Sequence, residues 1–135
     1  MMQHMVHKAA VALILAGGLA ACEPMEPVEQ GPFDPSYLGI NTRLLDGDLV
    51  NFFVTMRGAR SDADVDDYAR CAAVQYALIR GYGFARHVRT QINERNGVWH
   101  GDAVYTISAA LPRGLKTIDA EVGVTECIEN AIPRV

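Results

Sequence analysis

The spacing of hydrophobic and polar residues predicts two strands at the start of the folded region. Residues 49–57 give the clearest pattern, because apolar and polar residues alternate there with a period of two. One face of this strand is expected to carry Val50, Phe52, Val54 and Met56. Residues 37–45 are expected to pair with it, because Asp46-Gly47 between the two segments is a hairpin turn signal.

A helix is expected to follow, beginning at Ser61 and closed by Gly81 in a left-handed conformation. Aspartates fill the first turns of this helix, where free N–H groups and the helix dipole favour negative charge. They are Asp62, Asp64, Asp66 and Asp67. Its buried stripe is predicted to be Val65, Tyr68, Ala69, Ala72, Tyr76 and Ile79. A calcium loop is disfavoured, since the glycine and terminal glutamate of that motif are missing.

The remaining residues predict two more strands and a second helix. Residues 84–92 and 98–110 are expected to be strands joined at Asn96-Gly97, so that Arg95 faces Val98 and His87 faces about Thr106. Residues 117–131 are expected to be helical, with an apolar side of Ile118, Val122, Ile128 and Ile132. The predicted order is β-β-α-β-β-α, a small α+β domain over residues 36–135 with helices on one face of an antiparallel sheet.

The N-terminal segment predicts the cellular location of the protein. Residues 9–18 are apolar but too few to span a hydrocarbon core, which needs roughly 20 residues. The next residues, Leu19-Ala20-Ala21-Cys22, resemble the lipobox of bacterial lipoprotein precursors. The resemblance implies that residues 1–21 are a signal peptide and that acyl chains on Cys22 anchor the protein in a membrane. The alternative is a buried N-terminal helix, which Gly17-Gly18 would weaken.

This resemblance implies a location in the bacterial cell envelope, facing the periplasm. Because Glu23 rather than Asp follows the cysteine, the inner leaflet of the outer membrane is favoured. Residues 22–35 then form a tether, with four prolines and four acidic residues from position 23 onwards, a composition that favours an extended chain. Loss of Lys8 with the signal leaves 11 basic and 16 acidic residues, a net charge of −5 that argues against nucleic acid as a partner.

Two cysteines, Cys71 and Cys127, remain besides the one in the lipobox. In an oxidising periplasm they favour a disulfide, which would close a loop of 56 residues and stabilise the fold by about 4 kcal/mol in the chain-entropy model. The alternative is a pair of buried free thiols that pack as small hydrophobes. The spacing fits neither a redox motif nor a zinc site, and no metal or cofactor is expected.

The segment from 50 to 88 resembles a family of small alphaproteobacterial envelope lipoproteins of uncharacterised function. Its motifs are Phe-x-Val-x-x-Arg-Gly at 52–58, Tyr68-Ala69-x-Cys71-Ala72-Ala73 and Arg80-Gly81-Tyr82. Members usually carry Arg-Ala-Ala where this chain has Cys-Ala-Ala, a departure that suits a disulfide specific to this chain. They also carry Gly-Tyr-x-x-Phe, where this chain has Phe84 one position earlier. The resemblance implies a fold and a location in the cell envelope, but it implies no reaction, ligand or catalytic residue.

The candidate binding residues cluster around the second hairpin. Arg86, Arg89 and Arg95 could bind an anion, and Trp99 near the hairpin tip could anchor a partner. The alternatives are a solvated sheet face and a tryptophan folded onto the sheet. The first hypothesis is therefore a non-catalytic interaction module that binds an envelope protein or glycan. The second is a regulator or inhibitor of a cell-wall enzyme, or a weak hydrolase that uses His87 or His100; a purely structural role in the envelope is the third.

Overall fold

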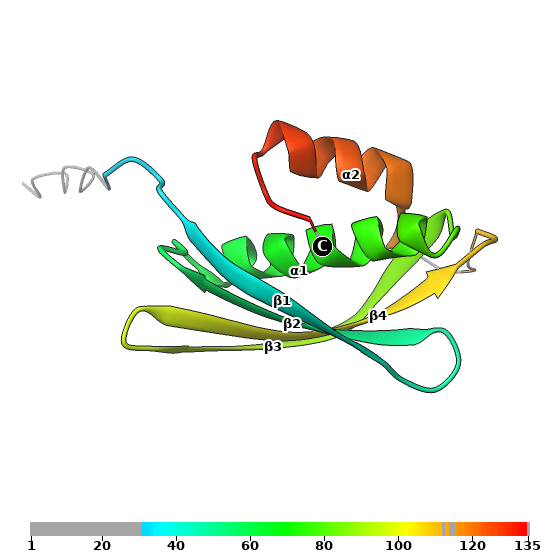
Figure 1. Cartoon of the computed structure of the whole chain (residues 1–135), viewed down its shortest axis with the longest axis horizontal. Helices are drawn as coiled ribbons and strands as arrows, with labels where there is room; N and C mark the ends of the chain where they lie inside the picture. Colours follow the sequence, from blue (N-terminus) through cyan, green and yellow to red (C-terminus); the bar gives the residue numbers. More distant parts are fainter. Residues whose placement is uncertain (1–30, 112, 114–115, 135) are drawn as a thin grey trace, which may run out of the picture.

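Five antiparallel strands form one sheet, and both helices lie on the same side of it (Figure 1). The computed structural model describes residues 31–111, 113 and 116–134, so the predicted signal peptide, Cys22 and residues 22–30 of the predicted tether lie outside the described residues. The elements are β1 (Ser36–Leu44), β2 (Leu49–Arg57), α1 (Asp62–Ile79), β3 (Phe84–Arg95), β4 (Val98–Ser108), β5 (Thr117–Asp119) and α2 (Ala120–Glu129). The order of strands across the sheet is β1-β2-β4-β3-β5. The predicted α+β class is confirmed.

The segment predicted as a helix over 117–131 begins with a short strand instead. Thr117–Asp119 pairs with the first residues of β3, which gives the order β-β-α-β-β-β-α. The helix α2 begins only after Asp119, whose carboxylate accepts hydrogen bonds from the backbone N–H groups of Glu121 and Val122. The prediction missed β5 because a three-residue strand leaves too few positions for an alternating pattern.

The hairpin of β3 and β4 has the predicted turn but a different register beyond its middle. Arg95 faces Val98 as expected, whereas His87 faces Tyr105 instead of Thr106. The shift arises at an irregularity between His87 and Arg89, where Val88 has no partner on β4. Such a bulge places one extra residue in a strand and reverses the faces of the residues on one side of it.

The core lies between the sheet and α1. The predicted inward face of β2 is buried, with Val50, Phe52, Val54 and Met56 all at most 1% exposed. Close packing at this interface depends on Gly101 of β4, because a Cβ there would lie 2.8 Å from Val65 of α1 and 2.9 Å from Val54. The helix ends at Ile79, and Gly81 just beyond it has a left-handed φ of +78°, as predicted. Ile79 does not belong to the buried stripe, since it lies in the last turn and is 60% exposed.

The predicted cap of α1 is wrong in its chemistry, although its position is right. Ser61 is the residue before the helix, but its side chain makes no capping hydrogen bond. The buried carboxylate of Asp64 instead accepts from the backbone N–H of Arg60 at 2.7 Å and from its guanidinium at 2.8 and 3.1 Å. These bonds hold the pKa of Asp64 below its usual value.

Small residues determine which side of α2 packs against α1. The buried residues of α2 are Ala120, Gly123 and Cys127, whereas Val122 and Ile128 are more than half exposed. The predicted apolar side is therefore wrong for these two residues. A Cβ at Gly123 would lie 2.8 Å from Val74 of α1, so the absence of a side chain allows the helices to approach closely.

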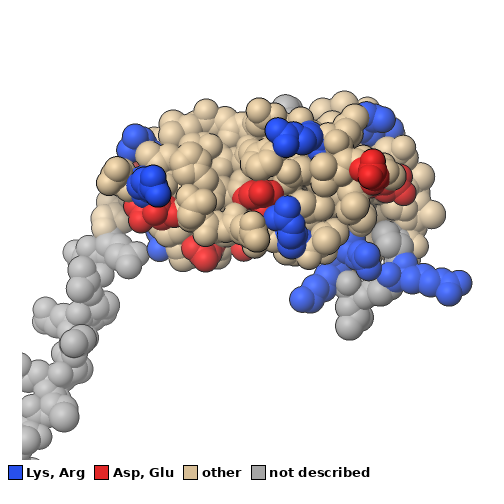
Figure 2. Space-filling view, turned by 90° about the horizontal axis from the view of Figure 1, so that it is seen from below, with Lys and Arg blue, Asp and Glu red and all other residues tan. Residues whose placement is uncertain are grey.

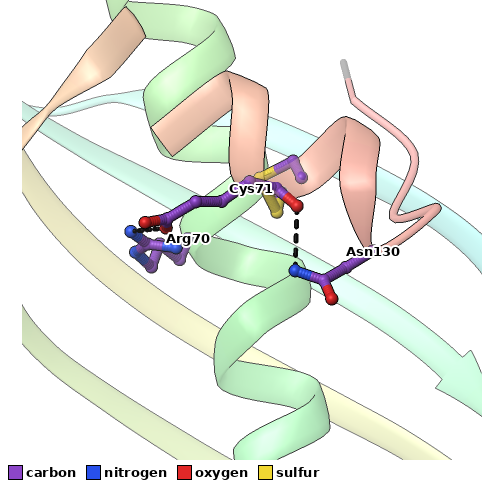
Figure 3. The surroundings of a disulfide bond; sticks show 5 residues. Arg70, Cys71 and Asn130 are labelled. Carbon is purple, nitrogen blue, oxygen red and sulfur yellow. Dashed lines mark hydrogen bonds and ion pairs between the residues drawn. A yellow bond between two sulfur atoms is a disulfide. The ribbon is translucent and has the colours of Figure 1, made fainter. Parts of the chain in front are cut away.

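A disulfide between Cys71 and Cys127 joins the two helices (Figure 3). Both cysteines are buried, at 1% exposure. The adjacent residues form an ion pair in which Arg70 donates to Glu126 at 2.6 Å, and Asn130 donates to the backbone carbonyl of Glu126 at 2.9 Å. The disulfide and the ion pair thus attach α2 to α1 at one place, whereas the Asn130 hydrogen bond lies within the C-terminal end of α2.

Candidate functional site

The candidate site is the face of the sheet opposite α1, here called the open face. In strands β1 to β4 it consists of the positions that alternate with the buried ones. Strand pairing assigns five arginines to it: Arg43, Arg57, Arg86, Arg89 and Arg95. On the same face these four strands carry a single carboxylate, that of Asp102. The open face therefore has a local excess of positive charge, although the whole chain has a net charge of −4.

The arginines are arranged in cross-strand rows rather than in one cluster. Arg57 and Arg95 both pair with Val98, one from each side, so their Cα atoms lie about 10 Å apart at the usual strand spacing. Arg43 and Arg89 stand at the two ends of a second row, which contains Asn51 and Val104 between them. In the view from the sheet side, basic side chains are spread along the molecule with uncharged and a few acidic side chains between them (Figure 2).

The single carboxylate at the centre of this face is held by its neighbours. Asn51, which is 5% exposed, donates to Asp102 at 2.6 Å and to the backbone carbonyl of Ala103 at 2.9 Å. Arg89 approaches Asp102 at 3.5 Å. Beside them, the guanidinium of Arg43 lies 5.4 Å from the centre of the Phe53 ring, a cation–π arrangement. The centre of the open face is therefore ordered, whereas Arg57 and Arg95 are exposed and form no ion pair within the described residues.

The helical side carries the opposite charge. Its helices contain seven acidic residues, namely Asp62, Asp64, Asp66, Asp67, Glu121, Glu126 and Glu129, and one basic residue, Arg70. The domain is thus electrostatically two-sided, with a basic sheet face and an acidic helical layer. A charge distribution of this kind orients a charged partner before contact.

Three of the four predicted binding residues share the open face, and Trp99 does not. Arg86, Arg89 and Arg95 lie on that face, but Trp99 pairs with Met56 on the side of α1 and packs half-buried against the core. This is the folded-over alternative for the tryptophan. Two arginines of the open face were not among the predicted site residues, Arg43 and Arg57. The alternation of β2 already placed Arg57 away from the core, and only the pairing of strands brings it next to Arg95.

The two histidines lie on opposite faces of the sheet and do not converge. His87 is on the side of α1, where its ring packs edge-on against Tyr105 at 5.2 Å and contacts the Thr90 hydroxyl at 2.6 Å. His100 is on the open face, 3.4 Å from the hydroxyl of Thr55. Within residues 31–111, 113 and 116–134, no three His, Cys, Asp or Glu side chains come together in a way that could hold a metal ion.

These features define a small α+β domain with one sheet face left open, and sequence comparison assigns it to a family. Residues 37–131 match the YNQ4 C-terminal domain, and the chain belongs to this family. A relative in Paracoccus denitrificans, described as an uncharacterized 26.9 kDa protein in the nqo8 5' region, is 33% identical over 85 residues. The match covers 63% of this chain and 33% of that protein, so the chain spans about a third of its curated relative.

The match identifies residues 37–131 as a domain of an uncharacterised family. No solved structure matches the chain significantly. Among the helices that the structure describes, none is long and apolar enough to cross a membrane.

Proposed function

We propose that this protein is a lipid-anchored lipoprotein of the bacterial envelope whose domain is a non-catalytic binding module. The anchor is supported by the sequence Leu19-Ala20-Ala21-Cys22 after a short apolar run. The proline-rich and acidic segment that follows would hold the domain away from the headgroups. The observation that carries the binding role is the charge of the open face, where strands β1 to β4 place five arginines and one carboxylate that is already hydrogen-bonded.

The occupant of the open face is an acidic surface of another envelope protein. The arginines stand in separate rows over four strands, an arrangement that suits an extended surface with several carboxylates better than one compact anion. Apolar and hydrogen-bonding side chains, including Phe53 and Gln91, lie between them. Arginine is enriched in protein interfaces because its planar guanidinium binds carboxylates in bidentate fashion. The partner is thus recognised through paired Arg–carboxylate contacts. The uncharged side chains between the arginines contribute shape complementarity.

The anchor is tested by removing the predicted acylation site. Wild-type protein should sediment with membranes and incorporate radiolabelled palmitate, whereas Cys22→Ser should lose the label and leave the membrane fraction. Cys71→Ala together with Cys127→Ala is the matched control, because it removes the other two cysteines and should leave the label in place. Equal labelling of wild type and Cys22→Ser would contradict the lipoprotein assignment.

The binding face is tested by photo-crosslinking in cells. A benzophenone amino acid at Gln91, exposed in the middle of the open face, should capture one acidic envelope protein. The same amino acid at Glu121, exposed on α2, is the matched control and should not capture that protein. Equal capture from both positions would contradict the proposal. Binding to purified peptidoglycan or lipopolysaccharide without a protein adduct would contradict the choice of a protein partner.

A further inference from the structure

A hollow of about 320 Å³ lies on the side of the sheet that faces α1, separate from the open face. It is open to solvent and is lined by residues of α1, of β3 and β4, and of the start of β5. Its volume falls at the lower end of small-molecule sites, about 300–1,000 Å³. Its aromatic wall consists of Tyr105 and the ring of His87, packed edge-on at 5.2 Å, and Ile118 adds an apolar side chain.

Two hydroxyl groups at the hollow form no hydrogen bond within the part of the chain that the structure describes. Tyr105 is only 3% exposed, and its hydroxyl forms no hydrogen bond with another described residue. The Thr117 hydroxyl is also buried without a partner in the described part of the chain. A buried polar group without a hydrogen bond is costly, since it has lost water and gained nothing in exchange. The Thr117 hydroxyl is such a buried unpaired group, whereas the Tyr105 hydroxyl is the one within reach of a ligand in the hollow.

The charge balance of the hollow favours a cation. Asp66 and Asp67 of α1 line it, and neither forms an ion pair with another described residue. The pKa of Asp67 is raised, chiefly by partial burial; Arg70 opposes this rise, and the carboxylates of Asp64 and Asp66 add to it. The guanidinium of Arg70 also lines the hollow but is engaged by Glu126 at 2.6 Å. Lys116 and Asp67 are both exposed, and with Arg70 paired to Glu126 the lining keeps two carboxylates against the one ammonium group of Lys116.

We infer that this hollow binds a small organic amine with an apolar or aromatic body. The body would pack against Tyr105, His87 and Ile118, and the ammonium group would lie beside the carboxylates of Asp66 and Asp67. The Tyr105 hydroxyl, which lies close enough to Asp66 and Asp67 to feel their charges, would accept a hydrogen bond from the ammonium group. Each part of the ligand thus meets a chemically matching wall.

The test uses three probes of nearly the same shape and different charge: phenethylamine, 2-phenylethanol and phenylacetate. The full-length chain with Cys22→Ser is titrated with each probe while backbone amide shifts are followed by NMR. Phenethylamine should shift amides of residues lining the hollow, with a dissociation constant of about 1 mM, typical of a probe with so few atoms. Phenylacetate should bind at least about tenfold more weakly, because its carboxylate would lie beside those of Asp66 and Asp67. A tenfold difference corresponds to about 1.4 kcal/mol.

Two variants and a control decide between the hollow and non-specific binding. Asp66→Asn with Asp67→Asn should abolish the preference for the amine, and Tyr105→Phe should weaken the amine severalfold. Asp62→Asn removes a carboxylate from the first turn of the same helix, outside the hollow, and should change neither. The inference is overturned if no probe shifts the amides of the hollow, if phenylacetate binds as tightly as phenethylamine, or if the preference survives in the double variant.

Discussion

Asn51 donates a hydrogen bond to Asp102 over 2.6 Å, between the neighbouring strands β2 and β4. The contact occupies the one carboxylate that strands β1 to β4 place on the open face. Because Arg89 also approaches Asp102, at 3.5 Å, one arginine is partly compensated. Arg57 and Arg95 at the far end of the face form no ion pair among the described residues, so they remain available for a partner.

Replacing Asn51 by alanine should destabilise the domain. The substitution removes two hydrogen bonds from a residue that is 5% exposed and leaves Asp102 short of a donor. The expected loss in the free energy of unfolding is about 1–3 kcal/mol. Urea denaturation measures it, with Asn93→Ala, exposed on the same face, as the control. A loss no larger than that of the control would refute the structural role of Asn51.

Removing the disulfide should have a larger effect. Cys71→Ala with Cys127→Ala opens a loop with a sequence separation of 56, and the chain-entropy model gives a loss of about 4 kcal/mol. Urea denaturation of this variant and of the reduced wild type should give similar midpoints, both below that of the oxidised protein. If reductant leaves the midpoint of the wild type unchanged while both thiols become titratable, the disulfide does not stabilise the fold.

Gly101 should tolerate no side chain while α1 keeps its position. The Cβ of Gly101→Ala would lie 2.8 Å from Val65 and 2.9 Å from Val54, and overpacking of this kind costs about 1–3 kcal/mol. Gly83→Ala is the control, since no atom lies within 4 Å of the added Cβ. Thermal denaturation should separate the two variants. Gly101→Ala should lower the melting temperature less in the Val65→Ala background than in the wild type, because the smaller side chain at position 65 makes room for the added Cβ.

The Arg60–Asp64 contact should make stability depend on pH in the acid range. Hydrogen bonds from Arg60 lower the pKa of Asp64 in the folded state. Their contribution is therefore present above the unfolded pKa of an aspartate and is lost as the pH falls through the lower folded value. Asp64→Asn should cost about 1 kcal/mol at pH 7, because the Arg60 side chain is 54% exposed.

The difference between wild type and Asp64→Asn in urea midpoint should shrink as the pH is lowered below the pKa of Asp64. Asp62→Asn, which replaces an exposed carboxylate in the same turn, serves as the control for the loss of charge at the helix start. A difference that stays constant from neutral to strongly acid pH would show that Asp64 acts through packing rather than through its charge.

Most of the sheet and both helices could be predicted from the sequence, because long elements repeat their pattern many times. The alternation in β2 identified the buried face, and the turn residues located both hairpins. The start of α2 could not be found in this way. Three residues of β5 carry no periodic signal, and the packing side of α2 depends on small residues such as Gly123 rather than on the largest apolar ones.

The candidate site was only partly predictable, since it depends on which strands are neighbours. Arg86, Arg89 and Arg95 were recognised from one strand, but Arg57 joins Arg95 only because β2 and β3 both pair with β4. The bulge at Val88 likewise has no sequence signal, although it turns His87 towards Tyr105 and into the hollow. Properties that arise from pairing between distant segments need the three-dimensional structure.

The most direct test of the binding role measures the crosslinked adduct from Gln91 after neutralising two arginines of the open face. Arg57→Gln with Arg95→Gln should reduce the yield of the adduct at least about tenfold, because buried or partly buried charge pairs at interfaces contribute about 2 kcal/mol or more when one partner is removed. Arg80→Gln, at the exposed end of α1, is the control and should leave the yield unchanged. An adduct of undiminished yield in the double variant would contradict recognition through the arginines of the open face.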